Sequence, residues 1–505
     1  MSDRITTPDR IETGRGGTPD GRPSFPAHQE PSVWRPFVKV GLPLVVGAGI
    51  ALAPVPDGLT QDAWLYFALF AAVMLAVVTE PMPIAAVGLM GIVAAGVSGL
   101  IGESPAEATA WALSGFANST VWLVFAACLF AVGYEKTGLG RRIALLLIRK
   151  MGRRTLGLGY ATMFADLSLA PFMPSNTARS GGTIYPILTN IPGLYGSRPN
   201  DPSARKIGSY LIYNALAITC VTSSTFQTAL APNVMALAIV SATIGVNIAW
   251  LDWFLAAAPV GILLLAIVPF LLYKIYPPEI KESPDAPRWA AAELGQMGPF
   301  SRREKTLLVL VSAALAMWIG ADDYIDATMV AMLVVTLMLL LRVITWQDAL
   351  GNGPAWNILI WLATLVTLAN GLARVGFVKW LAESLAPTFA SHGVAVSMTL
   401  LVTSFFFLHY LFAGVTSHVS ALLPVFLAVA VELPGATPLG WAMLLCLPLG
   451  LMGIITPYGT GPSPIYYSCG YIPSKDFWRL GAILGLLYFV TYVSIGIPWL
   501  RFLGF

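Results

Sequence analysis

The chain has 505 residues, of which 56% are hydrophobic and only 11% charged, and its mean hydropathy is +0.73. A soluble domain carries about 25% charged residues, so this composition excludes an ordinary soluble protein and predicts a polytopic, all-α membrane protein. No basic tract with interleaved aromatic residues is present, so nucleic acid is not an expected partner. The four cysteines lie in or beside apolar segments without paired spacing, which is typical of packing residues.

Apolar runs divide the chain into two membrane-embedded halves. Residues 1–35 are polar and predict a disordered cytoplasmic tail, with no signal peptide. A first half at 36–273 and a second half at 306–505 flank a polar cytoplasmic connector at 274–305. We expect about eleven spans, near 36–55, 63–80, 84–101, 112–134, 207–245, 250–273, 306–320, 326–341, 357–375, 440–470 and 480–500. The spans at 207–245 and 440–470 are interrupted by polar residues, Gly and Pro.

One stretch, PFMPSNTARSGGTIYP at 171–186, is polar and rich in Gly and Pro, yet apolar segments flank it. Its freed backbone N–H and C=O groups would have no partners in lipid, so it must be buried in protein or line a wet cavity. The sequence therefore predicts a re-entrant hairpin at about 156–194 with Ser-Asn-Thr at its tip. Before it, Arg141–Arg154 is basic at both ends and apolar between, which favours an interfacial helix.

The chain also matches itself at an offset of 238 residues. WLVFAACLFAVGYEKTGLG at 122–140 aligns with the second half, so that Lys136 meets Arg374 and Gly138 meets Gly376. Threading the predicted spans gives these segments opposed directions, which indicates inverted repeats. The offset then predicts a second re-entrant hairpin at about 396–432, and four irregular segments are expected to converge on one site.

The distribution of lysine and arginine residues predicts which loops face the cytoplasm. Most of these residues fall in the tail and in loops that the threading places on one side of the membrane, which the positive-inside rule makes the cytoplasm. We therefore expect an inner (plasma) membrane protein of a bacterium with a cytoplasmic N-terminus.

The predicted site is rich in hydroxyls, amides and free backbone groups and poor in carboxylates. Helix N-termini and hydroxyl or amide donors suit an anion, so an acidic substrate is expected. Arg179 could engage a carboxylate with two hydrogen bonds, or it could anchor to lipid or close a helix end. His418 could equally be a site residue or a packed histidine. The candidate substrate-binding residues are Ser175, Asn176, Thr177, Arg179, Thr225, Thr228, Thr416, Ser417, His418, Thr456, Gly459 and Thr460.

The stretch MPSNTARSGG, followed by YPI, and TPYGTGPSPIYYSCGYI near the C-terminus resemble the divalent anion:sodium symporter family. The resemblance is strongest to its citrate/succinate and tartrate/succinate antiporters and its plastid 2-oxoglutarate/malate translocator. It implies a homodimer whose protomers have a scaffold domain and a transport domain that moves as an elevator. It also implies a sodium ion at each Ser-Asn-Thr tip, here at Ser175 and Asn176, with no other cofactor.

The expected function is secondary transport of di- or tricarboxylates such as malate, succinate, 2-oxoglutarate, tartrate or citrate, rather than enzymatic catalysis. Exchange is favoured over sodium symport, because the offset places Gly414 where the second tip would carry Asn, and because Arg179 and His418 offer fixed positive charge. Sodium-coupled transport of dicarboxylates or divalent inorganic anions is the alternative. A channel is less expected because one chain supplies an asymmetric site, and an intramembrane enzyme because no catalytic motif is present.

Overall fold

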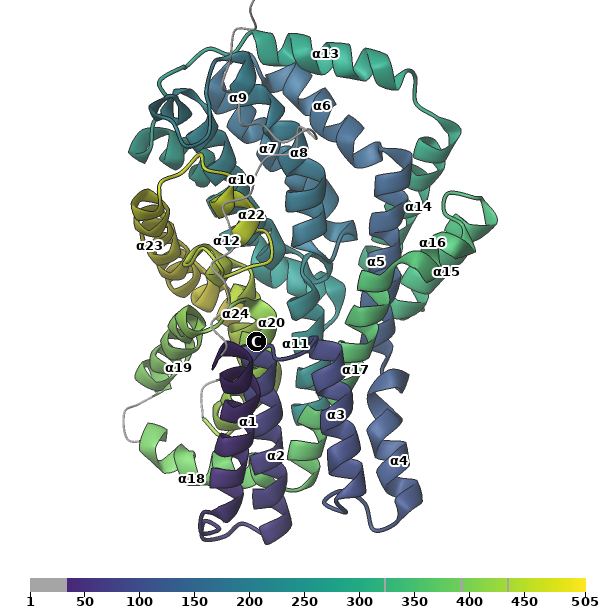
Figure 1. Cartoon of the computed structure of the whole chain (residues 1–505), viewed down its shortest axis with the longest axis vertical. Helices are drawn as coiled ribbons and strands as arrows, with labels where there is room; N and C mark the ends of the chain where they lie inside the picture. The colour runs from purple at the N-terminus through teal and green to yellow at the C-terminus, as the bar shows by residue number, and fades with distance from the viewer. Residues whose placement is uncertain (1–33, 322–323, 391–393, 434–435) are drawn as a thin grey trace, which may run out of the picture.

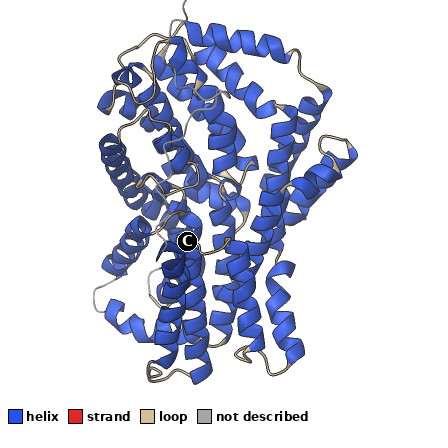
Figure 2. Cartoon of the chain, viewed as in Figure 1, coloured by secondary structure: helices blue, strands red, loops and turns tan. Residues whose placement is uncertain are grey.

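A computed structural model describes residues 34–505 except 322–323, 391–393 and 434–435, so nearly all of the predicted tail lies outside the described residues. Within the described part of the chain, Figure 2 shows helices and connecting loops, with no strand. Five helical segments are long and apolar enough to cross a membrane. They are Gln61–Thr79, Pro105–Thr137, Trp250–Ile275, Gly353–Arg374 and Ser474–Phe502. The prediction of an all-helical protein with several membrane-length helices is confirmed.

The first half contains helices α1 to α12. Those before the first hairpin are α1 (Trp34–Leu52), α2 (Gln61–Thr79), α3 (Ile84–Val97), α4 (Pro105–Leu113), α5 (Ser119–Thr137) and α6 (Leu139–Met151). The hairpin and the segments after it are α7 (Thr155–Leu169), η2 (Ala170–Phe172), η3 (Thr177–Ile184), α8 (Tyr185–Leu188), α9 (Asn190–Leu194), η4 (Pro202–Lys206), α10 (Gly208–Thr225), η5 (Gln227–Ala229), α11 (Ala231–Ile244) and α12 (Trp250–Ile275). The predicted break in the span at 207–245 therefore lies between α10 and α11.

The connector and the second half contain α13 to α24. They begin with α13 (Asp285–Met297), α14 (Arg302–Gly320), α15 (Ala327–Leu340), α16 (Trp346–Gly351), α17 (Gly353–Arg374) and α18 (Phe377–Ala390). They continue with α19 (Val394–Leu408), η6 (His409–Leu411), α20 (Val415–Val431), α21 (Pro438–Cys446), η7 (Leu447–Leu449), η8 (Leu451–Ile454), α22 (Ser463–Ser468), α23 (Ser474–Thr491), η9 (Tyr492–Gly496) and α24 (Ile497–Phe502).

Helix boundaries recur at the predicted offset. The helix α6 begins at Leu139 and α18 at Phe377, and the second arms of the two hairpins begin at Thr177 and Val415. Figure 1 shows α6 and α18 near opposite ends of the molecule, as opposed orientation of the halves would require. The sequence analysis had not identified α18, the counterpart of the interfacial helix α6. Its charged residues Lys379 and Glu383 lie four residues apart on one exposed face, 3.9 Å from each other, and form the polar side of the helix.

The polar connector contains the helix α13, which was not among the predicted elements. Ala286, Ala290 and Leu294 follow one another at four-residue spacing and are buried, which gives the helix one apolar face. Figure 1 shows α13 lying across one end of the molecule beside α6. The buried Arg142 of α6 donates to the carbonyl of Gly298, at the C-terminal end of α13, and to the carboxylate of Glu304 in α14. These bonds fix the position of α6 against α14.

Candidate functional site

The tip of the first hairpin lies against the break of the second broken span. The break between η8 and α22 covers residues 455–462. Asn176 is buried, and its Nδ2 donates to Thr460 Oγ1 at 2.7 Å. The next residue, Thr177, lies so close to Gly461 that a Cβ added there would fall 1.9 Å from Thr177 Oγ1. Residues 284 positions apart in sequence therefore meet side by side.

The second hairpin is tied to the same break from another direction. His409, at the end of its first arm, lies with its Nε2 2.7 Å from the Gly459 carbonyl oxygen. A carbonyl oxygen only accepts, so Nε2 must carry the proton and donate. The Thr456 hydroxyl is buried in the same break and has no hydrogen-bond partner in the structure. A buried hydroxyl without a partner indicates a place where a ligand or a water completes the bonding.

His418 lies in the first turns of α20, beside the second tip. Its side chain is fully buried, and neither ring nitrogen has a hydrogen-bond partner among the described residues. The ring packs edge-to-face against Phe405, Phe412 and His409, with centroids 4.5, 5.4 and 5.2 Å away. Thr416 and Ser417 precede it in the same helix, and Ser417 is 5% exposed. The structure therefore places these three predicted residues at the second tip.

Arg179 has a different environment from the one expected. Its side chain is fully buried in η3, and Nε donates to both carboxylate oxygens of Asp166 at 3.2 and 3.3 Å. One terminal nitrogen donates to the carbonyls of Met173 and Ala229, each at 2.8 Å. The other donates to the hydroxyls of Thr219, Thr222 and Ser223. The guanidinium is therefore fully hydrogen-bonded within the protein.

These contacts correct the premise that Arg179 offers an unpaired positive charge to a substrate. The charge of Arg179 is balanced by Asp166. Its N–H groups also donate to backbone carbonyls at two helix interruptions, that of Met173 just before the first tip and that of Ala229 between α10 and α11. Asp166 was missed in the sequence analysis. A lone carboxylate inside the apolar run of the hairpin's first arm was the available signal.

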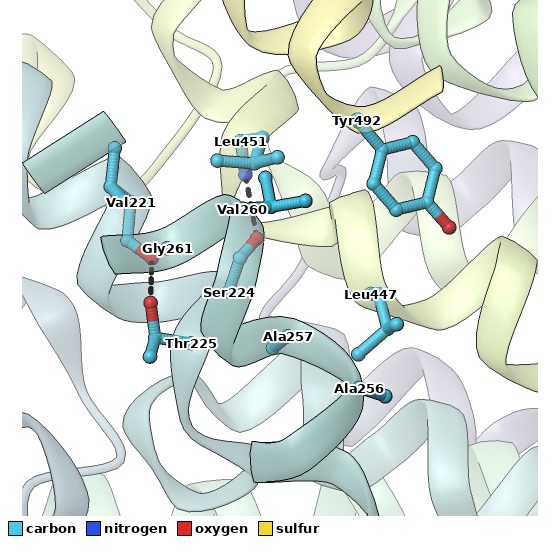
Figure 3. A pocket seen from close by; sticks show the side chains of 10 residues that line it. All are labelled: Val221, Ser224, Thr225, Ala256, Ala257, Val260, Gly261, Leu447, Leu451 and Tyr492. Carbon is cyan, nitrogen blue, oxygen red and sulfur yellow. Dashed lines mark hydrogen bonds between the residues drawn. The ribbon is translucent and has the colours of Figure 1, made fainter. Parts of the chain in front are cut away.

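Thr225 and Thr228 are also engaged away from the hairpin tips. Thr225 donates to the Val221 carbonyl, one turn earlier, and lines a pocket of only about 10 Å³ against α12, as Figure 3 shows. Thr228 donates to the Pro171 carbonyl at 2.5 Å and accepts from Trp250 Nε1 at 3.1 Å. The bonds of Thr228 tie the break between α10 and α11 to the first hairpin and to α12, whereas the bond of Thr225 lies within α10.

Ser175 lines an open cavity of about 810 Å³, which lies between α5, the first hairpin and the α16–α17 region. Its hydroxyl accepts from the Ala178 N–H at 3.2 Å, which caps the start of the second arm. Other hairpin residues on the cavity wall are Met173, Ala178, Gly182 and Thr183. The open cavity therefore reaches the first tip at Ser175, as a solute pathway would require.

Residues 35–505 match the family described as the sodium:sulfate symporter transmembrane region. The chain belongs to this family. An L-tartrate/succinate antiporter of Shigella sonnei (strain Ss046) is 48% identical over 470 residues, which cover 91% of this chain and 96% of the relative. The L-tartrate/succinate antiporter of Escherichia coli (strain K12) gives the same identity and coverage.

The fold is shared with a solved transporter structure. The crystal structure of the Alcanivorax borkumensis YdaH transporter matches with a TM-score of 0.56 at 14% sequence identity, covering 93% of this chain and 97% of that chain. The predicted family and its antiporter branch are therefore confirmed, and the chain is an integral, multi-pass membrane transporter rather than an enzyme.

The contact between the first tip and the 455–462 break gives a first prediction. Gly461→Ala would force the new Cβ into Thr177, and Asn176→Ala would remove the bond to Thr460. A neutral hydrogen bond contributes about 0.5–1.5 kcal/mol, so Asn176→Ala should lower transport by roughly two- to tenfold, and Gly461→Ala should lower it through the steric clash. Gly295→Ala in α13 is the matched control, because no atom lies within 4 Å of its added Cβ. Normal transport by both site variants in proteoliposomes would contradict this placement of the tip.

The Arg179–Asp166 pair gives a second prediction. Arg179→Gln leaves a carboxylate buried without its cation, which costs about 3–5 kcal/mol, so the yield of folded protein should fall sharply. The double variant Asp166→Asn with Arg179→Gln removes both charges and keeps hydrogen-bonding groups, so folding and transport should both recover. Thermal unfolding and uptake measured on the same preparations separate the roles. A double variant that folds normally but does not transport would show that Arg179 acts on the substrate after all.

Proposed function

We propose that the chain exchanges small dicarboxylates, such as L-tartrate and succinate, across the inner membrane of a bacterium. The relatives named as L-tartrate/succinate antiporters support the substrate class, because they align over 91% of this chain. The observation that carries the proposal is the contact between Asn176 and Thr460, because it joins the tip of a hairpin to the interruption of a helix. The amide and hydroxyl donors and the helix ends at such a place suit a carboxylate.

The proposed binding groups are neutral donors. Asn176, Thr177 and Thr460 meet at the first tip, where η3 begins with the positive end of its dipole. His418 at the second tip and Thr456 in the 455–462 break have buried polar atoms that need a partner. The complete proposed set is Ser175, Asn176, Thr177, Thr416, Ser417, His418, Thr456, Gly459 and Thr460. Arg179, Thr225 and Thr228 are left out, because other protein groups engage them.

Exchange is proposed over sodium symport on two grounds. The relatives are antiporters, and Gly414 stands at the start of α20, where Asn176 stands before η3 in the first half. The fixed charge of Arg179 no longer supports exchange, because Asp166 balances it. The neutral oxygens of Ser175 and Asn176 suit a sodium ion in chemical type, so sodium-coupled transport remains the second candidate.

The family resemblance and the recurring helix boundaries support further proposals on architecture. The two halves are inverted repeats with a cytoplasmic N-terminus, and both hairpins are re-entrant. The hairpins and broken spans move together as a transport domain, and a scaffold domain forms a homodimer. The proposed dimer face is that of α3 and α4, where Met90, Val93, Val97 and Leu113 are exposed around an apolar hollow that a partner would fill.

The proposed function predicts uptake of labelled succinate into proteoliposomes only when they contain L-tartrate or succinate, at equal rates in sodium and potassium buffers. Empty vesicles of the same preparation are the control for uniport or symport. Sodium-dependent uptake into empty vesicles would establish the symporter instead. Uptake of sulfate alone, or single-channel currents, would contradict the dicarboxylate proposal.

A further inference from the structure

The cavity that reaches Ser175 has one basic residue on its wall, Lys136 at the end of α5. Its side chain is 42% exposed, so an incoming solute can reach it. Asp348 and Glu135 line the same cavity, whereas the deeper wall is formed by uncharged residues of the hairpin and of α17. A dianion that enters here must therefore pass this group of charges before it meets the hairpin tip.

Lys136 is held in position by its acidic neighbour. Its Nζ lies 2.5 Å from Asp348 Oδ2, and the backbone N–H and the hydroxyl of Thr345 donate to the same oxygen at 2.7 Å. Hydrogen bonds from Lys136 and then Thr345 lower the pKa of Asp348 to about 2, so this carboxylate is charged at physiological pH. An ammonium has three donors, and in the structure Asp348 is the partner of one of them, so donors remain for a carboxylate.

A similar pair of a cation and a carboxylate occurs in the second half. The offset of 238 that aligns Lys136 with Arg374 also aligns Gly138 with Gly376, and both glycines have positive φ, 74° and 82°. Arg374 lies 3.8 Å from Glu107, with both side chains about half exposed. Glu107 and Asp348 are each the third residue after the N-cap of a short helix, α4 or α16, that precedes a long one. Each pair therefore joins the end of one half's long helix to the short helix of the other half.

We propose that Lys136 and Arg374 are repeat-related encounter sites for the dicarboxylate, one on each face of the membrane. This rests on the proposed transport of dicarboxylates through the cavity and on the inverted repeats. Lys136 offers the dianion an exposed ammonium that offsets the repulsion by Asp348 and Glu135 at the cavity of this structure, and Arg374 has the same role on the opposite face after the transport domain has moved. The acidic partner fixes each cation at the mouth rather than letting it follow the substrate inward.

Glu135 makes the inference testable in both directions. It lines the same cavity next to Lys136 and carries the opposite charge, so it should repel a dianion. If charge at the mouth governs encounter, neutralising Lys136 should raise KM, and neutralising Glu135 should lower it, with little change in the maximal rate. A general loosening of the α5–α16 contact cannot produce this opposite pair of effects.

The experiment measures KM for succinate on each face separately, using right-side-out and inside-out proteoliposomes that contain L-tartrate. Lys136→Met should raise KM about three- to tenfold on its own face, with a smaller effect at high salt because charges are screened. Lys136→Arg should restore it. Arg374→Met should raise KM on the other face. The matched controls are Arg288→Met and Lys379→Met, exposed cations on the two faces outside the cavity wall, which should change nothing.

Exchange by the wild-type protein tests the proposed function, and the effect of the variants on KM tests the encounter sites. A wild-type protein that exchanges no dicarboxylate would refute the proposed function itself. A wild-type protein that exchanges succinate while Lys136→Met leaves KM unchanged on both faces would overturn only this inference. The same is true if Glu135→Gln raises KM, because the mouth would then not act through its charge.

Discussion

Backbone N–H and C=O groups that no helix pairs cannot lie in hydrocarbon without other partners, and this constraint organises the molecule. The hairpins and broken helices leave such groups free at 173–176, 226–230, 412–414 and 455–462. Buried side chains meet the carbonyls there. Arg179 bonds the carbonyls of Met173 and Ala229, Thr228 bonds that of Pro171, and His409 bonds that of Gly459. The irregular segments are therefore held against one another, deep in the protein.

The same constraint explains how the structure can support transport. Helix ends that face one another inside a membrane protein provide donors for an anion without a buried, unpaired cation. Asn176, Thr460 and Thr456 belong to such ends, and they come from distant parts of the chain. Arg179, a buried cation near the site, holds the helix interruptions together, and its charge is balanced by Asp166. A site built in this way leaves the charge of the substrate to be balanced by neutral dipoles.

Much of this arrangement could be predicted from the sequence. Gly and Pro interrupt apolar runs at both hairpins and both broken spans, and the observed breaks lie within the predicted ranges. The offset of 238 also placed the second tip beside His418. The partners of polar side chains could not be predicted, because they depend on packing between distant segments. Arg179 shows this: its position three residues after Asn176 suggested a substrate ligand, but the partner that decides its role is Asp166, thirteen residues earlier on another arm.

The measurement that tests the central claim most directly is a structure of the transporter with L-tartrate bound, determined by cryo-electron microscopy in a lipid nanodisc. The account predicts density for the ligand between the 175–177 tip and the 456–460 break, with a carboxylate oxygen within about 3.2 Å of Asn176 or Thr460. Arg179 should remain bonded to Asp166. Ligand density against Thr225 and α12, or a guanidinium of Arg179 that has left Asp166 for the ligand, would contradict it.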